Sequence, residues 1–269
     1  MTKRTNRWRR ISVLGALALC VLLTSQTRSA WAQDEPRPGR QASAMPRGLE
    51  VYQGRVIAQT MHFSGAEWLV RENRESEERC SLMLTNLGVK PGANVCDMGC
   101  GNGFYSLQLA RLVGEQGQVY AVDVQPEMLY FLRDRADSAG IENISPILGS
   151  MYDPRLPRDS IDLVLMVDVY HEFSHPQHML AGIRRALKPD GVIVLLEYRA
   201  EDPDVPIKPL HKMSKEQVDL EMTSNGFKLV ESFDELPWQH MLFYGRDEEW
   251  TAPDGYPNEA PGNSRPARR

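Results

Sequence analysis

The sequence has few cysteines, and their number excludes a disulfide-stabilised fold. The 269 residues contain four cysteines, and Cys20 lies in an N-terminal apolar segment. Cys80, Cys96 and Cys100 are left for the folded part, and an odd number does not form a disulfide framework. No Cys/His spacing is typical of a zinc site, so we expect no metal centre.

The sequence also lacks internal repeats and a basic stripe with interleaved aromatic residues. Nucleic-acid binding depends on neutralising phosphates with Lys and Arg, whereas this chain has a formal net charge of −5. Its first 32 residues contain six basic residues and no acidic residue, so the remainder carries −11. We therefore expect no nucleic-acid partner.

The N-terminal apolar run, residues 11–23, is too short for a comfortable membrane span. It follows a basic segment and precedes a small-x-small sequence at 30–32, a pattern typical of a cleaved signal peptide. We predict a signal peptide over residues 1–32, export to the periplasm, and no stable membrane span after cleavage. Two alternatives remain open. Arg9 and Arg10 are compatible with twin-arginine export, and translation from Met45 would give a cytoplasmic protein.

Composition divides the rest of the chain into four segments. Residues 33–47 are polar and rich in Pro, Arg and Gly, which predicts a disordered tether. Residues 48–75 are predicted to form an N-terminal strap, and residues 76–247 the main domain. Residues 248–269 are rich in Pro and Gly without periodicity, which predicts a disordered tail. A hydrophobic content of 42% is enough for one sizeable core.

The most informative stretch is residues 95–103, Val-Cys-Asp-Met-Gly-Cys-Gly-Asn-Gly, followed by a second strand pattern that ends at Asp123. It reads as strand, glycine turn, helix, strand and acid. Glycines let backbone N–H groups approach a ligand with no Cβ in the way. An acid at the end of the next strand can accept hydrogen bonds from both ribose hydroxyls. The pattern predicts a nucleoside-binding crevice.

The glycine spacing distinguishes two kinds of nucleoside ligand. The dinucleotide fingerprint is G-x-G-x-x-G, whereas here Gly99, Gly101 and Gly103 alternate and Asp97 precedes them. Asp97 would lie close to any pyrophosphate, so the turn suits a cationic ligand better than an anionic one. The alternative, a turn that is glycine-rich for structural reasons alone, predicts no ligand.

This Asp-x-Gly-x-Gly-x-Gly pattern resembles motif I of the class I S-adenosylmethionine-dependent methyltransferases. The resemblance extends from about Ser76 to Arg246, and includes Leu-Lys-Pro-Asp-Gly at 187–191. It implies a doubly wound α/β fold with a mostly parallel seven-stranded sheet, helices on both faces and an antiparallel last strand. Alternating helical and apolar strand patterns independently indicate a mostly parallel sheet.

The resemblance also implies a methyltransferase with S-adenosylmethionine as its cofactor. The candidate cofactor-binding residues are Asp97, Gly99, Cys100, Gly101, Gly103, Asp123, Val124, Ser150, Met151 and Asp168. Ser150 occupies the position where relatives usually have an acid for the adenine, and Asp153 is an alternative acid. Cys100 is either a redox-sensitive group beside the cofactor or simply a small residue tolerated by a tight turn.

The candidate catalytic residues are His171 and Asp168, which follow the fourth strand of the main domain. Asp168 is expected to face the methionyl end of the cofactor. His171 is the best general-base candidate because its ordinary pKa is near neutrality, although a helix-cap or core histidine is the alternative. Glu172 is expected to orient His171 or to face solvent. Glu197 and Tyr198 are predicted to form the pocket wall.

In this family the strap position often holds a lid over the acceptor. The candidate substrate contacts there are His62, Trp68 and Arg71, with a purely structural strap as the alternative. Charged residues between 72 and 79 are predicted to form a solvated helix face with i,i+4 pairing and no function.

The short insertions leave no platform for DNA, RNA or a large protein, so we predict a small-molecule methyl acceptor. Two other functions remain open at this stage. The chain could bind a nucleoside-like ligand without catalysis, or it could be a nicotinamide-dependent oxidoreductase, against which Asp97 and the glycine spacing argue.

Overall fold

The computed structural model describes residues 45–257, so the predicted signal peptide, most of the tether and the end of the tail lie outside the described residues. The main strands are β3 (Asn94–Met98), β4 (Gln118–Asp123), β5 (Ile144–Leu148), β6 (Ile161–Val167), β7 (Leu187–Arg199), β8 (Lys212–Met213), β9 (Phe227–Phe233) and β10 (Gln239–Arg246). The α-helices are α1 (Arg74–Glu78), α2 (Cys80–Asn86), α3 (Phe104–Val113), α4 (Pro126–Ala139), α5 (Pro176–Ala186) and α6 (Lys215–Thr223). The strap contains the hairpin strands β1 (Val51–Tyr52) and β2 (Arg55–Val56) and the 3-10 helix η1 (Phe63–Val70), and two further 3-10 turns are η2 (Tyr170–Glu172) and η3 (Pro209–His211).

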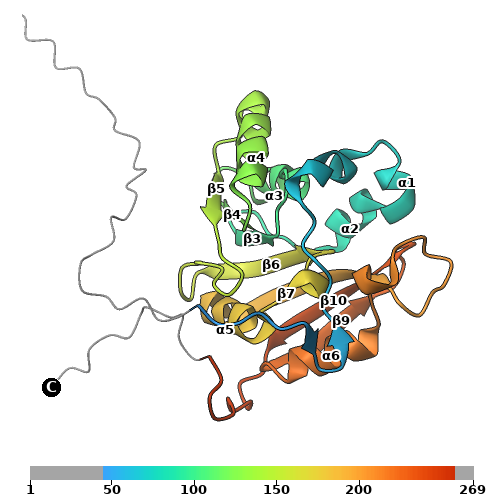
Figure 1. Cartoon of the computed structure of the whole chain (residues 1–269). Helices are drawn as coiled ribbons and strands as arrows, with labels where there is room; N and C mark the ends of the chain where they lie inside the picture. Colours follow the sequence, from blue (N-terminus) through green and yellow to red (C-terminus); the bar gives the residue numbers. More distant parts are fainter. Residues whose placement is uncertain (1–44, 258–269) are drawn as a thin grey trace, which may run out of the picture. The chain divides into compact units, whose positions relative to one another are not determined.

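The sheet has the strand order β5-β4-β3-β6-β7-β10-β9, and the two-residue β8 pairs with β7 outside this path (Figure 1). Strands β3 to β8 pair in parallel, whereas β10 runs antiparallel to both β7 and β9. The predicted doubly wound, mostly parallel fold with an antiparallel last strand is therefore confirmed. The short β8 is an addition to the seven expected strands.

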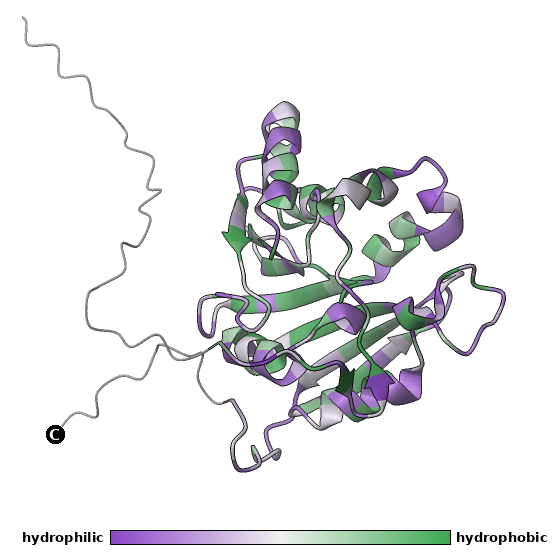
Figure 2. Ribbon diagram, viewed as in Figure 1, coloured by the Kyte–Doolittle hydropathy of each residue, from purple (hydrophilic) through white to green (hydrophobic). Residues whose placement is uncertain are grey.

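Helices cover both faces of the sheet. Helices α2 and α3 pack on one face, where Val95 and Val119 belong to the same buried cluster. Ala121 lies two residues after Val119, so it points to that face too, and α4 packs there through Leu129 and Leu132. Helices α5 and α6 cover the other face with a second buried cluster. In Figure 2, apolar residues follow the central strands and polar residues follow the outer helix surfaces.

The helix boundaries follow from local sequence signals. Helix α4 begins at Pro126, whose fixed φ suits the first turn, and ends at Gly140 in the left-handed conformation. Helix α6 begins after Ser214, whose side chain accepts a hydrogen bond from the Gln217 N–H. Because α4 begins directly after β4, its first turn lies at the carboxyl end of that strand.

The predicted solvated helix at 72–79 differs from the structure. Its short helix α1 buries Arg74 and Glu78, which are 5% and 1% exposed, and the Arg74 guanidinium pairs with the Glu78 carboxylate at 2.8 Å. Arg74 lies over the rings of Phe104 and Tyr105. The i,i+4 pair is present as expected, but it faces the protein interior because aromatic rings of α3 cover it.

The predicted disordered tail also needs a correction in its described part, residues 248–257. Tyr256 is buried, and its hydroxyl donates to the Asn225 side chain at 2.9 Å. The Trp250 and Tyr256 rings make an edge-to-face contact. Two large aromatic side chains bind this segment to the domain, despite its Pro and Gly content.

Between residues 45 and 257, no helix combines the length and apolarity needed to cross a bilayer.

Candidate active site

A cavity of about 500 Å³ lies at the carboxyl ends of the parallel strands. Strand β3 has β4 on one side and β6 on the other, so the strand order reverses here, which is where ligands bind in doubly wound sheets. Eight of the predicted site residues line the cavity, namely Gly99, Gly101, Asp123, Val124, Ser150, Met151, Asp168 and His171.

The glycine turn brings the backbone close to neighbouring elements. Gly99 and Gly101 have φ values of 69° and 53°, in the left-handed region that side chains disfavour. A Cβ on Gly99 would approach the Val169 side chain to 2.3 Å, and one on Gly101 would approach Leu69 of the strap to 2.5 Å. Any larger residue at either position would move the cavity wall.

Asp123 ends β4 and joins the glycine turn to the next helix. One carboxylate oxygen accepts from the Gly101 N–H and the other from the Gln125 N–H, both at 2.9 Å. Burial raises the pKa of Asp123 despite these hydrogen bonds. Since each carboxylate oxygen has two lone pairs, Asp123 retains accepting capacity on the cavity side.

Three predicted cofactor residues lie behind the cavity wall. Asp97 is buried within β3 and accepts a hydrogen bond from the Ser106 hydroxyl at 2.5 Å. Cys100 packs in a buried cluster with Leu129 and Leu132, and burial raises the pKa of its thiol. A Cβ on Gly103 would meet the Leu132 side chain at 2.8 Å. Cys100 and Gly103 therefore serve the packing of α4 against the turn, and their cofactor roles stay predictions.

Asp97 is electrostatically the most constrained group of the turn. Burial raises its pKa to about 6, against the opposing hydrogen bond from Ser106, and the charge of Asp123 raises it further. Asp97 therefore ionises less readily than an exposed aspartate, and the nearby Arg74 guanidinium favours its ionised form.

The predicted adenine contacts lie along the loop after β5. Ser150 lines the cavity, and its hydroxyl oxygen accepts from the N–H groups of Asp153 and Tyr152 at 3.0 and 3.4 Å. The Asp153 carboxylate accepts from the Arg155 N–H instead, and Asp153 does not line the cavity. The structure thus places Ser150, not the alternative acid, at this part of the wall.

Asp168 follows β6 with a left-handed backbone, at φ 52°. One of its carboxylate oxygens accepts from the Gln239 side chain at 2.7 Å. The other is buried and has no hydrogen-bond partner among the described residues. Burial raises the pKa of Asp168 well above its ordinary value, and the charges of Glu78 and Glu197 act in the same direction. A cationic group in the cavity would satisfy this oxygen.

His171 lies in the η2 turn and is fixed by the carboxylate of Glu197, two residues before the end of β7. Its Nδ1 is 2.6 Å from a Glu197 oxygen, and the two side chains are 2% and 0% exposed. Burial alone would lower the pKa of His171, but the charge of Glu197 and the hydrogen bond to it raise it overall. Because Nδ1–H donates to Glu197, Nε2 is the nitrogen that faces the cavity.

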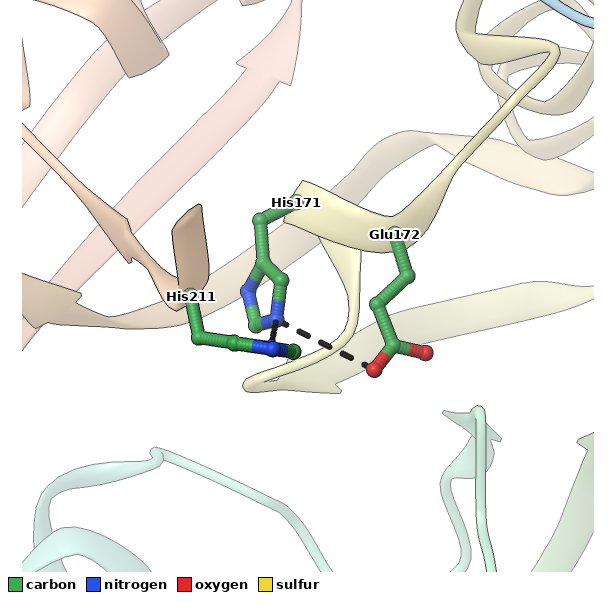
Figure 3. Close-up of side chains that lie close together, drawn as sticks. All are labelled: His171, Glu172 and His211. Atoms are coloured by element: carbon green, nitrogen blue, oxygen red, sulfur yellow. Dashed lines mark hydrogen bonds and ion pairs between the residues drawn. The ribbon is translucent and has the colours of Figure 1, made fainter. Parts of the chain in front are cut away.

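Two further residues meet His171 at this end of the cavity. The Nδ1 atom of His211 is 3.0 Å from His171 Nε2, and a Glu172 oxygen is 4.0 Å from it (Figure 3). Burial raises the pKa of Glu172 to about 7, although His171 opposes the shift. Sequence reasoning treated Glu172 only as an orienting or solvent-facing group and missed His211. The loop between β7 and β8 contributes His211, Pro206, Ile207 and Lys208 to the cavity lining.

The strap, residues 48–75, covers the cavity between the η2 side and the glycine-turn side. The Met61 N–H donates to Glu172 at 3.1 Å, and the Met61 carbonyl accepts from the Gln125 side chain at 2.9 Å. Of the predicted strap contacts, only Trp68 lines the cavity. His62 caps η1 by accepting from the Ser64 N–H, and Arg71 pairs with Glu77 and Glu78.

A buried ion pair anchors the start of the strap. The Arg55 guanidinium pairs with Glu221 of α6 at 2.7 Å and donates to the His171 carbonyl at 2.8 Å. Tyr170 donates its hydroxyl to the same Glu221 carboxylate at 2.9 Å. Strap, α6 and the His171 turn are thereby held together.

Comparison with known proteins identifies the fold and the chemistry. A family model described as a methyltransferase domain matches residues 89–245. The chain belongs to this family. A structure of an S-adenosylmethionine-dependent methyltransferase from Aquifex aeolicus superposes with a TM-score of 0.65 and 26% identity, covering 69% of this chain and 98% of that protein. The protein is thus a class I S-adenosylmethionine-dependent methyltransferase, and the nicotinamide alternative is set aside.

Curated relatives of this methyltransferase include ubiquinone/menaquinone biosynthesis C-methyltransferases. The one from Cupriavidus taiwanensis is 31% identical over 115 residues, which cover 43% of this chain and 47% of the relative. The one from Marinomonas is 26% identical over 156 residues, covering 56% and 62%. The matches with the first of these relatives thus span about half of their length.

The cavity fits the cofactor of this family. S-adenosylmethionine carries cationic groups and no phosphate, and one Asp168 oxygen lacks the hydrogen-bond partner that such a group supplies. Asp123 offers hydrogen-bond acceptors at the end of β4, and Gly99 and Gly101 line the wall without side chains. The residues present therefore suit this cofactor.

Proposed function

We propose that this methyltransferase transfers a methyl group to a small-molecule acceptor bound in the cavity beside His171. The observation that supports this proposal is a single cavity lined by Asp123 of the glycine-turn side and by His171, Glu172 and His211 of the η2 side. A cavity of about 500 Å³ matches the size of small-molecule sites.

The cofactor is bound by side chains from three parts of the cavity wall. Asp123 accepts the ribose hydroxyls, Asp168 holds the methionyl ammonium, and Ser150, Met151 and Val124 surround the base. When bound, S-adenosylmethionine supplies a methyl group already activated on a sulfonium. The chain therefore mainly has to align the acceptor and exclude water, and the strap and the 200–211 loop do so by closing the cavity.

The acceptor's proton is removed by His171. His171 Nε2 faces the cavity, while Nδ1–H is held by Glu197 at 2.6 Å. The Glu197 carboxylate fixes the ring and stabilises the imidazolium that forms when Nε2 takes up a proton. His171 is thus the general base for an acceptor with an acidic O–H or C–H group, and Asp168 contributes through the cofactor.

The curated relatives suggest which acceptors to test first. Their names describe C-methyl transfer in quinone biosynthesis, so phenolic ring compounds are the first class. Ionisation of a phenol activates both its oxygen and its ring carbons, and this matches a base at His171.

The first experiment is a calorimetric titration of S-adenosylmethionine into the purified protein, with NAD titrated in parallel. Saturable binding of S-adenosylmethionine alone supports the site, and transfer of a labelled methyl group to a panel of phenols then defines the acceptor. His171→Gln should abolish transfer and retain cofactor binding, whereas His178→Ala, on α5 outside the cavity, should change neither. Absence of binding in the folded protein would refute the proposed site.

We also propose that the protein is exported to the periplasm. The support is the basic segment, apolar run and small-x-small sequence within residues 1–32. Cell fractionation and N-terminal sequencing test it, with a mature start near Gln33 expected. A protein that begins at Met45 and stays in the cytoplasm would overturn it.

A further inference from the structure

We propose that His171, Glu172 and His211 bind a divalent transition-metal ion at the acceptor end of the cavity. Among residues 45–257, this is the one group of three His, Cys, Asp or Glu side chains whose ligand atoms gather closely enough for an ion. Binding of the ion stands independently, and its role toward the acceptor rests on the proposed function.

The geometry of the three ligand atoms supports the site. Two donors that each lie about 2.1 Å from one ion are at most about 4.2 Å apart. His171 Nε2 is 3.0 Å from His211 Nδ1 and 4.0 Å from the Glu172 oxygen, and all three atoms lie within 4.8 Å of one another. In Figure 3, the three side chains point toward a common space from η2 and from the end of the 200–211 loop. The 4.8 Å bound exceeds the 4.2 Å limit by about 0.6 Å, so binding of one ion by all three atoms requires a side-chain shift of at most about this size.

The surroundings of His171 resemble the outer shell of a metal site. A metal-binding histidine usually donates its other ring N–H to a carboxylate, which fixes the tautomer and raises the basicity of the ligating nitrogen. Glu197 is 0% exposed and accepts from His171 Nδ1. Glu172 is positioned in turn by the Met61 N–H. Two of the three ligands are therefore held in place by groups that do not touch the ion.

The local charge also favours a cation. Glu172, Glu197 and Asp168 contribute carboxyl groups around His171. Three basic groups oppose this negative charge. Arg55, which donates to the His171 carbonyl, and Arg74, which lines the cavity, are paired with Glu221 and Glu78, whereas Lys208 lines the same cavity and acts electrostatically on His211. The carboxyl groups outnumber the lysine, and Lys208 is exposed and can turn toward solvent.

The donor set indicates which ion binds. Two imidazoles and one carboxylate suit Zn²⁺, Fe²⁺ or Co²⁺, whereas Mg²⁺ prefers oxygen ligands alone. Three protein ligands leave coordination positions open toward the cavity. The acceptor class is then a hydroxyl compound whose oxygen binds the ion directly.

The bound ion changes how the acceptor is activated. His171 Nε2 has one lone pair, so it cannot hold the ion and take up a proton at the same time. With the ion in place, the acceptor O–H bond breaks, its electron pair stays on oxygen as a metal ligand, and the proton leaves to water. In the metal-bound protein the ion, as a Lewis acid, favours the anion, whereas His171 acts as the general base in the metal-free protein.

The test uses tag-free, full-length protein treated with chelator, into which Zn²⁺ is titrated calorimetrically, and Co²⁺ is followed by visible absorption. We expect one equivalent of Zn²⁺, Co²⁺ absorption bands typical of nitrogen and oxygen ligation, and no saturable Mg²⁺ binding. His211→Ala and Glu172→Gln should weaken Zn²⁺ binding at least tenfold, and the His178→Ala control should not. His211 is half-buried, so its variant is expected to fold, which circular dichroism checks.

Two results would overturn the site: no stoichiometric Zn²⁺ binding, or binding unchanged in both ligand variants. S-adenosylmethionine is titrated into the same samples without metal. Cofactor binding without metal binding refutes the metal site alone, whereas metal binding without cofactor binding refutes the proposed function alone.

Discussion

At the scale of single residues, Asp123 has two roles that can be tested separately. It is the predicted ribose acceptor, and it also holds the glycine turn through the N–H groups of Gly101 and Gln125. Asp123→Ala should weaken S-adenosylmethionine binding by roughly 1–3 kcal/mol, because buried polar groups lose their partners. Calorimetry measures the affinity, and Asp137→Ala, an exposed acid on α4, is the control. Unchanged affinity in a folded Asp123→Ala protein would remove the ribose assignment.

Asp97 makes the stability of the cofactor-free protein depend on pH. Its pKa is about 6 in the folded state, above the ordinary value of 3.8 that applies when the chain is unfolded. The folded state therefore holds this proton more tightly, so the contribution of Asp97 to the free energy of unfolding is largest below pH 4 and is lost as pH rises through 6. The decrease from this group is at most about 3 kcal/mol.

Asp97→Asn should remove this decrease, because asparagine does not ionise and can still accept from Ser106. The variant should be more stable than the parent at pH 7 without cofactor. Urea unfolding of both proteins at pH 4, 5 and 7 measures the difference between their free energies of unfolding. The other titrating groups are the same in both proteins, so their contributions cancel in this difference. A difference in free energy of unfolding that stays constant with pH would contradict the claim that burial raises the pKa of Asp97.

The glycine motif shows how far a sequence pattern predicts individual residues. It correctly located the turn, and Gly99, Gly101 and Asp123 line the cavity. It could not tell that Cys100 and Gly103 face the α4 helix, because a motif gives spacing along the chain and not the side of the turn that a neighbouring helix will cover. Their contacts with Leu132 depend on tertiary packing.

At the scale of elements, the strap is bound to the rest of the domain by the Arg55–Glu221 pair. The two side chains are 8% and 0% exposed. Arg55→Met should lower the free energy of unfolding by about 3–5 kcal/mol, since it leaves a buried carboxylate without its partner. The double variant Arg55→Met, Glu221→Gln should recover part of the loss. Urea unfolding measures both.

The matched control is the exposed pair of Lys215 and Asp234, whose side chains are 37% and 51% exposed. Lys215→Met should lower the free energy of unfolding by about 1 kcal/mol or less, because exposed ion pairs contribute little. Equal losses at the buried and exposed pairs would show that the strap anchor contributes no more than a surface contact.

Elements with strong periodicity or clear caps were predictable, and those without were not. Helix α4 spans 126–139, and Pro126 and Gly140 mark its two ends in the sequence. The 200–211 loop has no periodicity, and its contribution to the cavity depends on how the chain returns to β8. His211 is 40 residues from His171, so no local spacing relates them.

At the scale of the whole molecule, the cavity involves segments from most of the described chain. The strap, the glycine turn, the η2 turn and the 200–211 loop all contribute to its lining. A ligand in this cavity therefore bridges segments between Thr60 of the strap and His211 of the 200–211 loop.

Cofactor binding should consequently stabilise the entire domain. At a free concentration one hundred times Kd, S-adenosylmethionine should raise the free energy of unfolding by about 2.7 kcal/mol. Thermal unfolding with and without cofactor measures the shift, and amide hydrogen exchange should slow in both the strap and the 200–211 loop. Protection confined to the glycine turn would show that the closing segments do not respond to the ligand.

The Arg55–Glu221 contact joins residues 166 positions apart, and this separation bears on the order of assembly. Contacts between distant parts of a chain form only after the intervening residues have been made, and loop closure over such a span slows folding. The strap therefore reaches its final position only after α6 has left the ribosome, late in synthesis. A nascent chain that lacks α6 already contains the partners of Met61 and Ala66, but it lacks the carboxylate that neutralises Arg55. The last anchor of the strap therefore forms only when most of the chain has been translated.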